Sequence, residues 1–302
     1  MRMKAQANQF IGCDKPFEDA QTVLFGAPYD STTSFRPGTR FGPDVMRRES
    51  FGIETYSMRL DRDLVDDASV FDAGDLELPF GDPAAALAQI EARADEILAA
   101  GKTPCLLGGE HLVTLGAVRA AAKRRPDLRI VHFDAHADLR TDYLGNPLSH
   151  ASVMRRCHDL LGDGRIYQFG IRSGTRDERQ FMRDGHVTTE LFSDTTLESV
   201  VAALGPTAPI YLTVDLDVLD PAEFPGTGTP EAGGLGYERL RQSLMEIFSR
   251  LDVVAFDLVE LAPALDTSGR STALACKLLR ECLLAHVSSR TASRERCGNE
   301  IF

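Results

Sequence analysis

The segment from residue 132 to residue 138 places two carboxylates and one imidazole at alternating positions, namely Asp134, His136 and Asp138. It overlaps the end of an apolar run at residues 128–133, which is typical of a buried strand. Because successive side chains of an extended segment point to opposite faces, we expect these three side chains to share one face. Carboxylates at the end of a buried strand are unfavourable unless they are paired or bind a metal. The segment therefore predicts a cation site.

Two other apolar runs also end in residues of the type that binds metals. Asp215 and Asp217 repeat the alternating spacing after residues 209–214, and His111 follows Gly108-Gly109-Glu110 after residues 103–107. The predicted ligands are His111, Asp134, His136, Asp138, Asp215 and Asp217. Four aspartates and two neutral imidazoles carry a charge of −4, which two divalent cations would neutralise, whereas one cation would leave −2.

The donor set indicates which metal and which reaction to expect. Carboxylates with some imidazole and no thiolate favour manganese over structural zinc, so we predict two Mn²⁺ ions per chain. Two adjacent cations can lower the pKa of a shared water and supply a nucleophile for hydrolysis. His111 is expected to open a helix near residue 112, where the helix dipole favours the neutral imidazole that a metal requires.

Short apolar runs alternate with amphipathic segments along the whole chain, which favours a mainly parallel sheet with helices on both faces. The clearest predicted helix covers residues 83–100, with Asp82 as its cap and Gly101 at its end. The predicted strands lie near residues 22–26, 69–73, 103–107, 128–133, 165–170, 185–189, 209–215 and 252–258. In such folds ligands bind beyond the carboxyl ends of the strands, where the acidic and histidine residues stand here.

Composition limits the classes of function. The 302 residues are 43% hydrophobic and contain no apolar run of the ~18–20 residues that a membrane span needs. We expect one domain over residues 1–302, with an N-terminal arm at 1–20 and a polar C-terminal tail at 288–302. The polar N-terminus and six scattered cysteines predict a soluble, cytoplasmic protein with reduced thiols. A net charge of −12 argues against nucleic acid and anionic membranes as partners, and is compatible with a cationic substrate.

These motifs resemble the signatures of the ureohydrolase family, which contains arginases and agmatinases. The resemblance covers residues 22–285 and rests on three segments. They are Gly108-Gly109-Glu110-His111, Asp134-Ala135-His136-Ala137-Asp138, and Thr213-Val214-Asp215-Leu216-Asp217 with the loop 220–230 after it. The resemblance implies an arginase-type three-layer α/β/α fold with a mostly parallel eight-stranded sheet. It also implies hydrolysis of a guanidinium to urea and an amine, and a homo-oligomer, usually a trimer or hexamer.

The resemblance also implies a role for each site residue. His111 and Asp138 would hold one manganese and His136 and Asp217 the other, with Asp134 and Asp215 bridging the two. Glu260 matches the family glutamate that receives the guanidinium, which suits the planar fork of that group. His150 matches the histidine that shuttles protons or stabilises the attacked carbon; alternatively, it is only a polar residue at the start of a helix. Asp138 would also relay a proton.

The substrate is less clearly specified. Thr175 replaces the aspartate with which arginases read an α-amino acid, and the Asn-rich loop of arginases is absent from residues 139–143, so arginine is disfavoured. Residues 29–43 resemble an agmatinase loop, although they could equally be a surface connection. Agmatine is therefore the leading substrate, followed by N1-aminopropylagmatine. Guanidinobutyrate stays possible because Arg36, Arg140 or Arg172 could receive a carboxylate.

Two other classes compete with the hydrolase. A metal-dependent deacetylase would use one zinc and a pair of adjacent histidines, and the sequence has no such pair. A non-catalytic metal-binding relative would be expected to lack ligands, whereas all six and Glu260 are present. The amount of bound metal separates the three. His132 matches no family ligand and is interpreted as a buried structural histidine.

Overall fold

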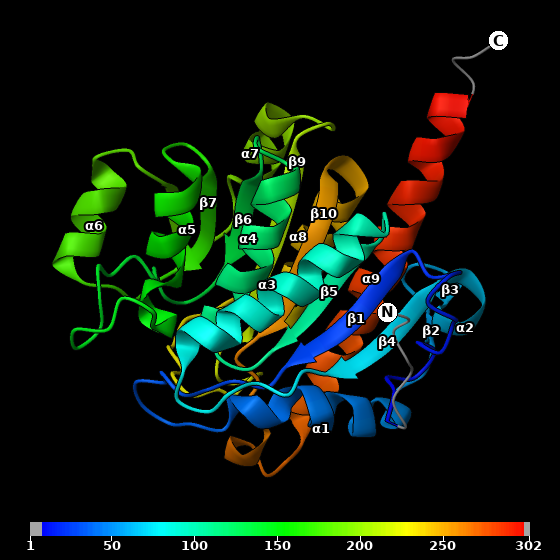
Figure 1. Ribbon diagram of the computed structural model, residues 1–302, viewed down its shortest axis with the longest axis horizontal. Helices are drawn as coiled ribbons and strands as arrows, with labels where there is room; N and C mark the ends of the chain where they lie inside the picture. The colour runs from blue at the N-terminus through cyan, green and yellow to red at the C-terminus, as the bar shows by residue number, and fades with distance from the viewer. Residues whose placement is uncertain (1–7, 299–302) are drawn as a thin grey trace.

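A computed structural model describes the backbone of residues 8–298 and the side chains of residues 8–287. Its centre is an eight-stranded sheet in the order β4-β1-β5-β10-β9-β6-β7-β8, in which every neighbouring pair is parallel (Figure 1). The strands are β1 (Thr22–Ala27), β4 (Val70–Asp75), β5 (Thr103–Gly108), β6 (Arg129–Phe133), β7 (Ile166–Ile171), β8 (Thr188–Leu191), β9 (Pro209–Asp215) and β10 (Asp252–Val259). A separate antiparallel hairpin joins β2 (Tyr56–Ser57) and β3 (Arg62–Asp63).

Helices cover both faces of the sheet and give three layers. One layer contains α3 (Pro83–Ala99), α4 (Thr114–Arg124), α5 (Val153–Leu161) and α6 (Arg176–Arg183). The other contains α1 (Gly42–Glu49), α2 (Leu64–Asp67), α7 (Leu197–Leu204), α8 (Tyr237–Arg250) and α9 (Arg270–Gly298). The predicted three-layer α/β/α fold with an eight-stranded sheet is therefore confirmed.

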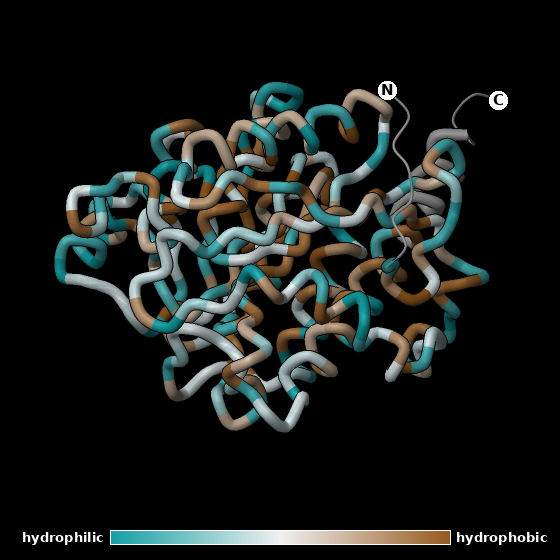
Figure 2. Tube along the Cα trace, turned by 60° about the horizontal axis from the view of Figure 1, so that its bottom comes forward, coloured by the Kyte–Doolittle hydropathy of each residue, from teal (hydrophilic) through white to brown (hydrophobic). Residues whose placement is uncertain are grey.

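The hydrophobic core lies in two clusters, one on each face of the sheet. Adjacent strand residues contribute to opposite clusters: Leu24 packs into one, whereas Val23 and Phe25 pack into the other. The central strands are apolar on both faces because helices cover both sides. Hydrophobic positions accordingly run through the middle of the molecule in Figure 2.

Local chemistry explains most element boundaries. The Asp82 carboxylate accepts the Ala85 N–H and caps α3, as predicted, and Gly101 with φ +72° follows its end. The strand predicted at 185–189 begins instead at Thr188, because Gly185, with φ +87°, closes the turn after α6. The predicted helix after His111 starts with a 3₁₀ turn over His111–Val113 before α4 begins.

The two predicted ends of the chain are only partly described. Phe10 and Cys13 in the expected N-terminal arm are buried, and the Phe10 N–H donates to Asp72 at 2.9 Å. Most of the expected C-terminal tail continues helix α9 up to Gly298. The five cysteines with described side chains are buried and unbridged. Among the described residues, no helix combines the length and apolar character that crossing a bilayer requires.

Candidate active site

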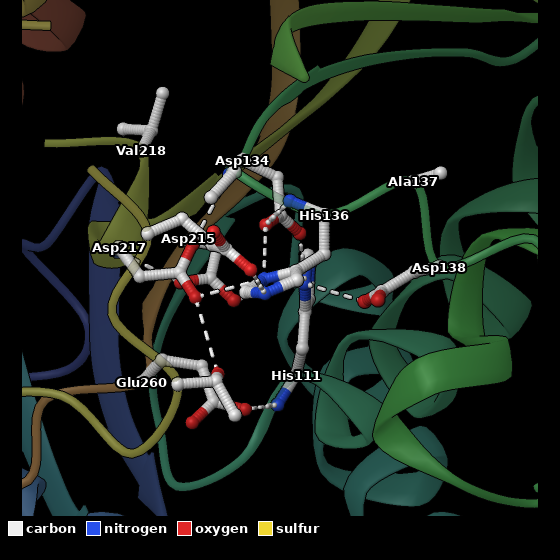
Figure 3. Close-up of polar contacts among 12 residues, drawn as sticks. His111, Asp134, His136, Ala137, Asp138, Asp215, Asp217, Val218 and Glu260 are labelled. Atoms are coloured by element: carbon white, nitrogen blue, oxygen red, sulfur yellow. Dashed lines mark hydrogen bonds and ion pairs between the residues drawn. The ribbon is translucent and has the colours of Figure 1, made fainter. Parts of the chain in front are cut away.

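The candidate site lies where four neighbouring strands end, in the order β5, β10, β9 and β6. His111 follows β5, Glu260 follows β10, Asp215 ends β9, and Asp134 follows β6. Since the carboxyl ends of parallel strands meet at one edge of a sheet, residues about 150 positions apart in sequence come together there. Figure 3 shows their side chains turned toward one another.

The imidazole of His111 faces three carboxylates through one nitrogen. Its Nδ1 lies 3.0 Å from Asp134 Oδ2, 3.2 Å from Asp138 Oδ2 and 3.3 Å from Asp215 Oδ2. The other ring nitrogen, Nε2, is 3.0 Å from the Thr213 hydroxyl, which itself donates to buried Asp257. The ring is therefore held so that Nδ1 points into the carboxylate cluster.

His136 forms the second half of the cluster. Its Nδ1 lies 3.4 Å from Asp134 Oδ1 and 3.0 Å from Asp217 Oδ2. Asp134 thus directs one carboxylate oxygen to each imidazole, the arrangement that a bridging carboxylate would need. The structure brings all six predicted ligands together.

The prediction that Asp134, His136 and Asp138 share one face of an extended strand was wrong. Strand β6 ends at Phe133, so Asp134, His136 and Asp138 do not share the face of an extended strand. They lie in a loop in which Asp138 adopts φ +53° and the His136 N–H donates to Asp134 Oδ1 at 2.6 Å. A left-handed residue in a tight loop, rather than strand alternation, turns the Asp138 side chain toward His111.

His132 is buried and orients Asp134. The Gln168 amide nitrogen donates to His132 Nδ1 at 3.0 Å, so His132 Nε2 carries the proton and donates to Asp134 Oδ2 at 2.8 Å. Neither ring nitrogen of His132 is available to a cation in this arrangement. His132 therefore has the structural role expected from the sequence.

The buried carboxylates make the site strongly selective for positive charge. Burial and the neighbouring Asp217 and Asp134 raise the pKa of Asp215 well above its usual range. Burial lowers the pKa of His111, but its three carboxylate partners outweigh this and raise it well above the usual value. The neutral His111 expected from the helix dipole is thus not favoured by the protein alone. A divalent cation would displace the imidazole protons, and the donor set of carboxylate oxygens and imidazole nitrogens fits Mn²⁺.

Glu260 lies beside the cluster in a constrained backbone conformation. It has φ +67°, its N–H donates to the Gly109 carbonyl at 2.9 Å, and its Oε1 accepts the His111 N–H at 2.8 Å. Its side chain is buried, and Oε1 is 3.7 Å from His150 Nδ1. The carboxylate is therefore held next to both the predicted metal centre and the predicted proton donor.

His150 faces the site and also begins a helical turn, so its position fits both predicted interpretations. It opens the 3₁₀ turn His150–Ser152 ahead of α5. Its Nε2 accepts the Ser34 N–H at 3.1 Å and lies 2.9 Å from the Ser34 hydroxyl. Burial alone would lower the pKa of His150, but the Glu260 carboxylate has the larger effect, and the pKa rises from 6.5 to about 9.

Sequence reasoning missed the role of Glu110. Its carboxylate accepts the Thr32 N–H at 3.0 Å and hydroxyl protons from Thr32 at 2.6 Å and Thr33 at 3.1 Å. Thr32 Oγ1 in turn accepts the His150 N–H at 3.2 Å. Glu110 thus fixes the 29–43 loop against His150, and this loop is not a mere surface connection. The signal available in the sequence was an acidic residue beside His111 with no assigned role.

The three arginines predicted as possible carboxylate receptors differ in their contacts. Arg172 donates to the carbonyls of Gly170, Asp217, Val218, Leu219 and Glu231, so it holds the loop after β9. Arg36 donates to the carbonyls of Thr227 and Gly228. Arg140 instead has its Nε 3.9 Å from Glu178 Oε2 and its guanidinium over the Tyr143 ring. Arg36 and Arg172 therefore hold loops in this structure, and Arg140 is the candidate receptor with the fewest competing contacts.

A cavity of about 200 Å³ opens onto the cluster. Its wall includes Asp138, His136, Asp215, His150 and Arg140. A second cavity of about 440 Å³ shares Arg140 and Glu178 with the first. Arg140 and Glu178 therefore stand between the two cavities.

Comparisons with known proteins agree with this geometry. The sequence profile of the Arginase family matches residues 20–285. The agmatinase of Bacillus subtilis (strain 168) is 46% identical over 281 residues, which cover 92% of this chain and 96% of the relative. The N(1)-aminopropylagmatine ureohydrolase of Thermococcus kodakarensis is 38% identical, covering 87% of this chain and 89% of the relative. The crystal structure of agmatine ureohydrolase of Thermoplasma volcanium has a TM-score of 0.84 and 34% identity, covering 93% of this chain and 94% of that chain.

Replacing Asp215 by Asn is expected to reduce bound manganese to one ion per chain or fewer, because the variant loses a charge where four carboxylates converge. Elemental analysis after dialysis against Mn²⁺ measures this. Asp127→Asn, at an exposed position, is the matched control and should retain the wild-type amount. Equal manganese in wild type and Asp215→Asn would contradict the predicted ligand set.

Without metal, His150 is expected to stabilise the fold in a pH-dependent manner. Its pKa is raised from 6.5 to about 9, so its contribution is fully present below pH ~6.5 and is lost as the pH rises through about 9. The shift corresponds to at most about 3 kcal/mol. Urea unfolding of wild type and His150→Asn in chelator, from pH 6 to 10, should show the difference in unfolding free energy shrinking. A difference that stays constant would refute the Glu260–His150 coupling.

Proposed function

The chain belongs to the arginase family, and we propose that it hydrolyses agmatine to urea and putrescine with two Mn²⁺ ions bound. The family assignment confirms the predicted ureohydrolase resemblance and sets aside the deacetylase alternative. One observation carries the proposal: six side chains suited to metal binding converge, three of them line a cavity that His150 also lines, and Glu260 lies 3.7 Å from His150. A non-catalytic relative has no need of that second pair of groups.

In the proposed enzyme, His111 and Asp138 would hold one Mn²⁺ and His136 and Asp217 the other, with Asp134 and Asp215 contributing to both. When bound, such a pair of ions activates water as a nucleophile at neutral pH. The contacts of Asp134 with both imidazoles support its shared role. Asp138, which lines the cavity, would also accept and relay a proton.

Glu260 and His150 perform the remaining steps. The Glu260 carboxylate binds the planar guanidinium and turns its carbon toward the metal-binding residues. As the bond from that carbon to the alkyl-substituted nitrogen breaks, the nitrogen needs a proton to leave as an amine. The Glu260 carboxylate favours protonated His150 by raising its pKa to about 9, and the protonated ring, whose Nε2 no longer accepts the Ser34 N–H, supplies that proton.

Thr175 and Arg140 lie where the far end of the substrate would be selected. Thr175, at the position of the arginase aspartate, caps α6 by accepting the Glu178 N–H, so it supports the expected exclusion of arginine. Two observations keep alternatives open. The second cavity has room for the longer N1-aminopropylagmatine. The guanidinium of Arg140, whose Nε lies 3.9 Å from Glu178, could receive the carboxylate of guanidinobutyrate.

The proposed partners, location and oligomeric state are compatible with the same family assignment. Its partner is a small cationic guanidino compound rather than nucleic acid or a membrane, which accords with the net charge of −12. A cytoplasmic location, a role in making polyamines, and a homo-oligomer of three or six chains complete the proposal.

Urea release from the manganese-loaded enzyme tests the substrate assignment. We expect the kcat/KM for agmatine to exceed that for arginine by at least about 100-fold, because the α-carboxylate and α-amino groups would lack partners. Glu260→Gln should lower agmatine turnover by at least about 100-fold, whereas exposed Glu198→Gln should not change it.

The same assay separates the alternatives. Faster turnover of guanidinobutyrate than of agmatine, abolished by Arg140→Gln, would replace agmatine with a guanidino acid. Faster turnover of N1-aminopropylagmatine would assign the second cavity to the substrate. Preference for arginine would overturn the specificity argument based on Thr175.

A further inference from the structure

A second cluster of metal-ligating side chains lies outside the active site. It consists of His158, Asp163 and His186, referred to below as the surface triad. His158 Nε2 is 2.7 Å and His186 Nδ1 is 2.8 Å from the same oxygen, Asp163 Oδ1. The three donor atoms all lie within 4.8 Å of one another. Nothing in the proposed hydrolysis uses these residues.

The surface triad is held in place by its neighbours. The His186 ring stacks on Phe181 with centroids 4.3 Å apart and planes 24° apart, and His158 meets Phe181 edge-on at 4.8 Å. Asp163 lies in a tight turn between Gly162 and Gly164, which both have positive φ. The two rings and the carboxylate therefore come from three chain segments that already face one another, at the side of the molecule where α5 and α6 lie in Figure 1.

We propose that the surface triad binds one divalent transition-metal ion, zinc above all, at a site separate from the catalytic centre. Two imidazole nitrogens and one carboxylate oxygen form a donor set that suits Zn²⁺. Tetrahedral zinc with bonds of about 2.0–2.1 Å needs donor atoms roughly 3.4 Å apart, which small side-chain rotations would reach. Asp163 has a side-chain exposure of 66%, so solvent can fill the fourth position.

Zinc binding would replace the protons that the imidazoles now direct at Asp163. Each nitrogen that becomes a ligand must lose its proton, either to the other ring nitrogen or to solvent. The ion would then connect the last turn of α5 to the turn that precedes β8, the edge strand of the sheet. His150 precedes α5 and His158 lies eight residues further on, about 12 Å along the helix, so the ion would not reach the cavity that opens onto the predicted metal ligands.

The test uses the manganese-loaded enzyme, titrated with zinc buffered by a chelator. Bound zinc and manganese are both counted by elemental analysis after gel filtration. We expect wild type to bind one zinc per chain beyond its manganese, and Asp163→Asn and His186→Gln to bind that zinc at least about tenfold more weakly. Exposed Asp159→Asn, next to His158 but outside the surface triad, is the matched control and should bind zinc like wild type.

A second measurement guards against misfolded variants and against zinc in the catalytic centre. Zinc should raise the thermal midpoint of wild type but not of His186→Gln, while manganese content and urea release stay unchanged in both. Equal zinc uptake by wild type and both variants would overturn the proposal. So would zinc uptake matched by an equal loss of manganese, because that zinc would occupy the catalytic centre.

Discussion

The repulsion among four buried carboxylates is the constraint on which the rest of the site depends. Asp134, Asp138, Asp215 and Asp217 are at most 6% exposed and lie at the ends of two neighbouring strands. Burial of such charges costs several kcal/mol for each ion unless positive charge compensates it. Two imidazoles fill part of that need as proton carriers, and two divalent cations would fill all of it. An affinity for metal would thus follow directly from the way the sheet buries its acidic residues.

The scaffold keeps this unfavourable cluster together by close packing and by hydrogen bonds. Gly109 has no room for a side chain, since a Cβ there would lie 2.0 Å from the Tyr29 carbonyl oxygen. The Gly-Gly pair before His111 therefore allows the 29–43 loop to pack against the end of β5. Arg172 holds the loop after β9 by donating hydrogen bonds to the backbone carbonyls of Asp217 and Val218. The segments that carry His111 and Asp217 are thereby held by contacts that need no metal.

Much of the fold and the convergence of the six side chains could be predicted because both follow from local patterns. Apolar runs located the eight strands, and acidic or histidine residues after them located the six converging side chains. What could not be predicted depends on contacts between distant segments. Glu110 acts through Thr32, 78 residues away, and Thr32 contacts His150 118 residues away. Asp138 reaches His111 only because its φ is +53°, which no periodicity reveals.

Thr175 stabilises the start of α6 and would also affect which substrates the site accepts. Its hydroxyl accepts the Glu178 N–H, and the Glu178 carboxylate accepts the Thr175 N–H, which closes a capping box at the start of α6. The other oxygen of Glu178 accepts the Leu139 N–H, so this cap also positions the loop that carries Arg140. A side chain engaged in that cap is not free to read an α-amino group. Discrimination at the far end of the substrate must therefore come from the loop itself, with Arg140 between the two cavities.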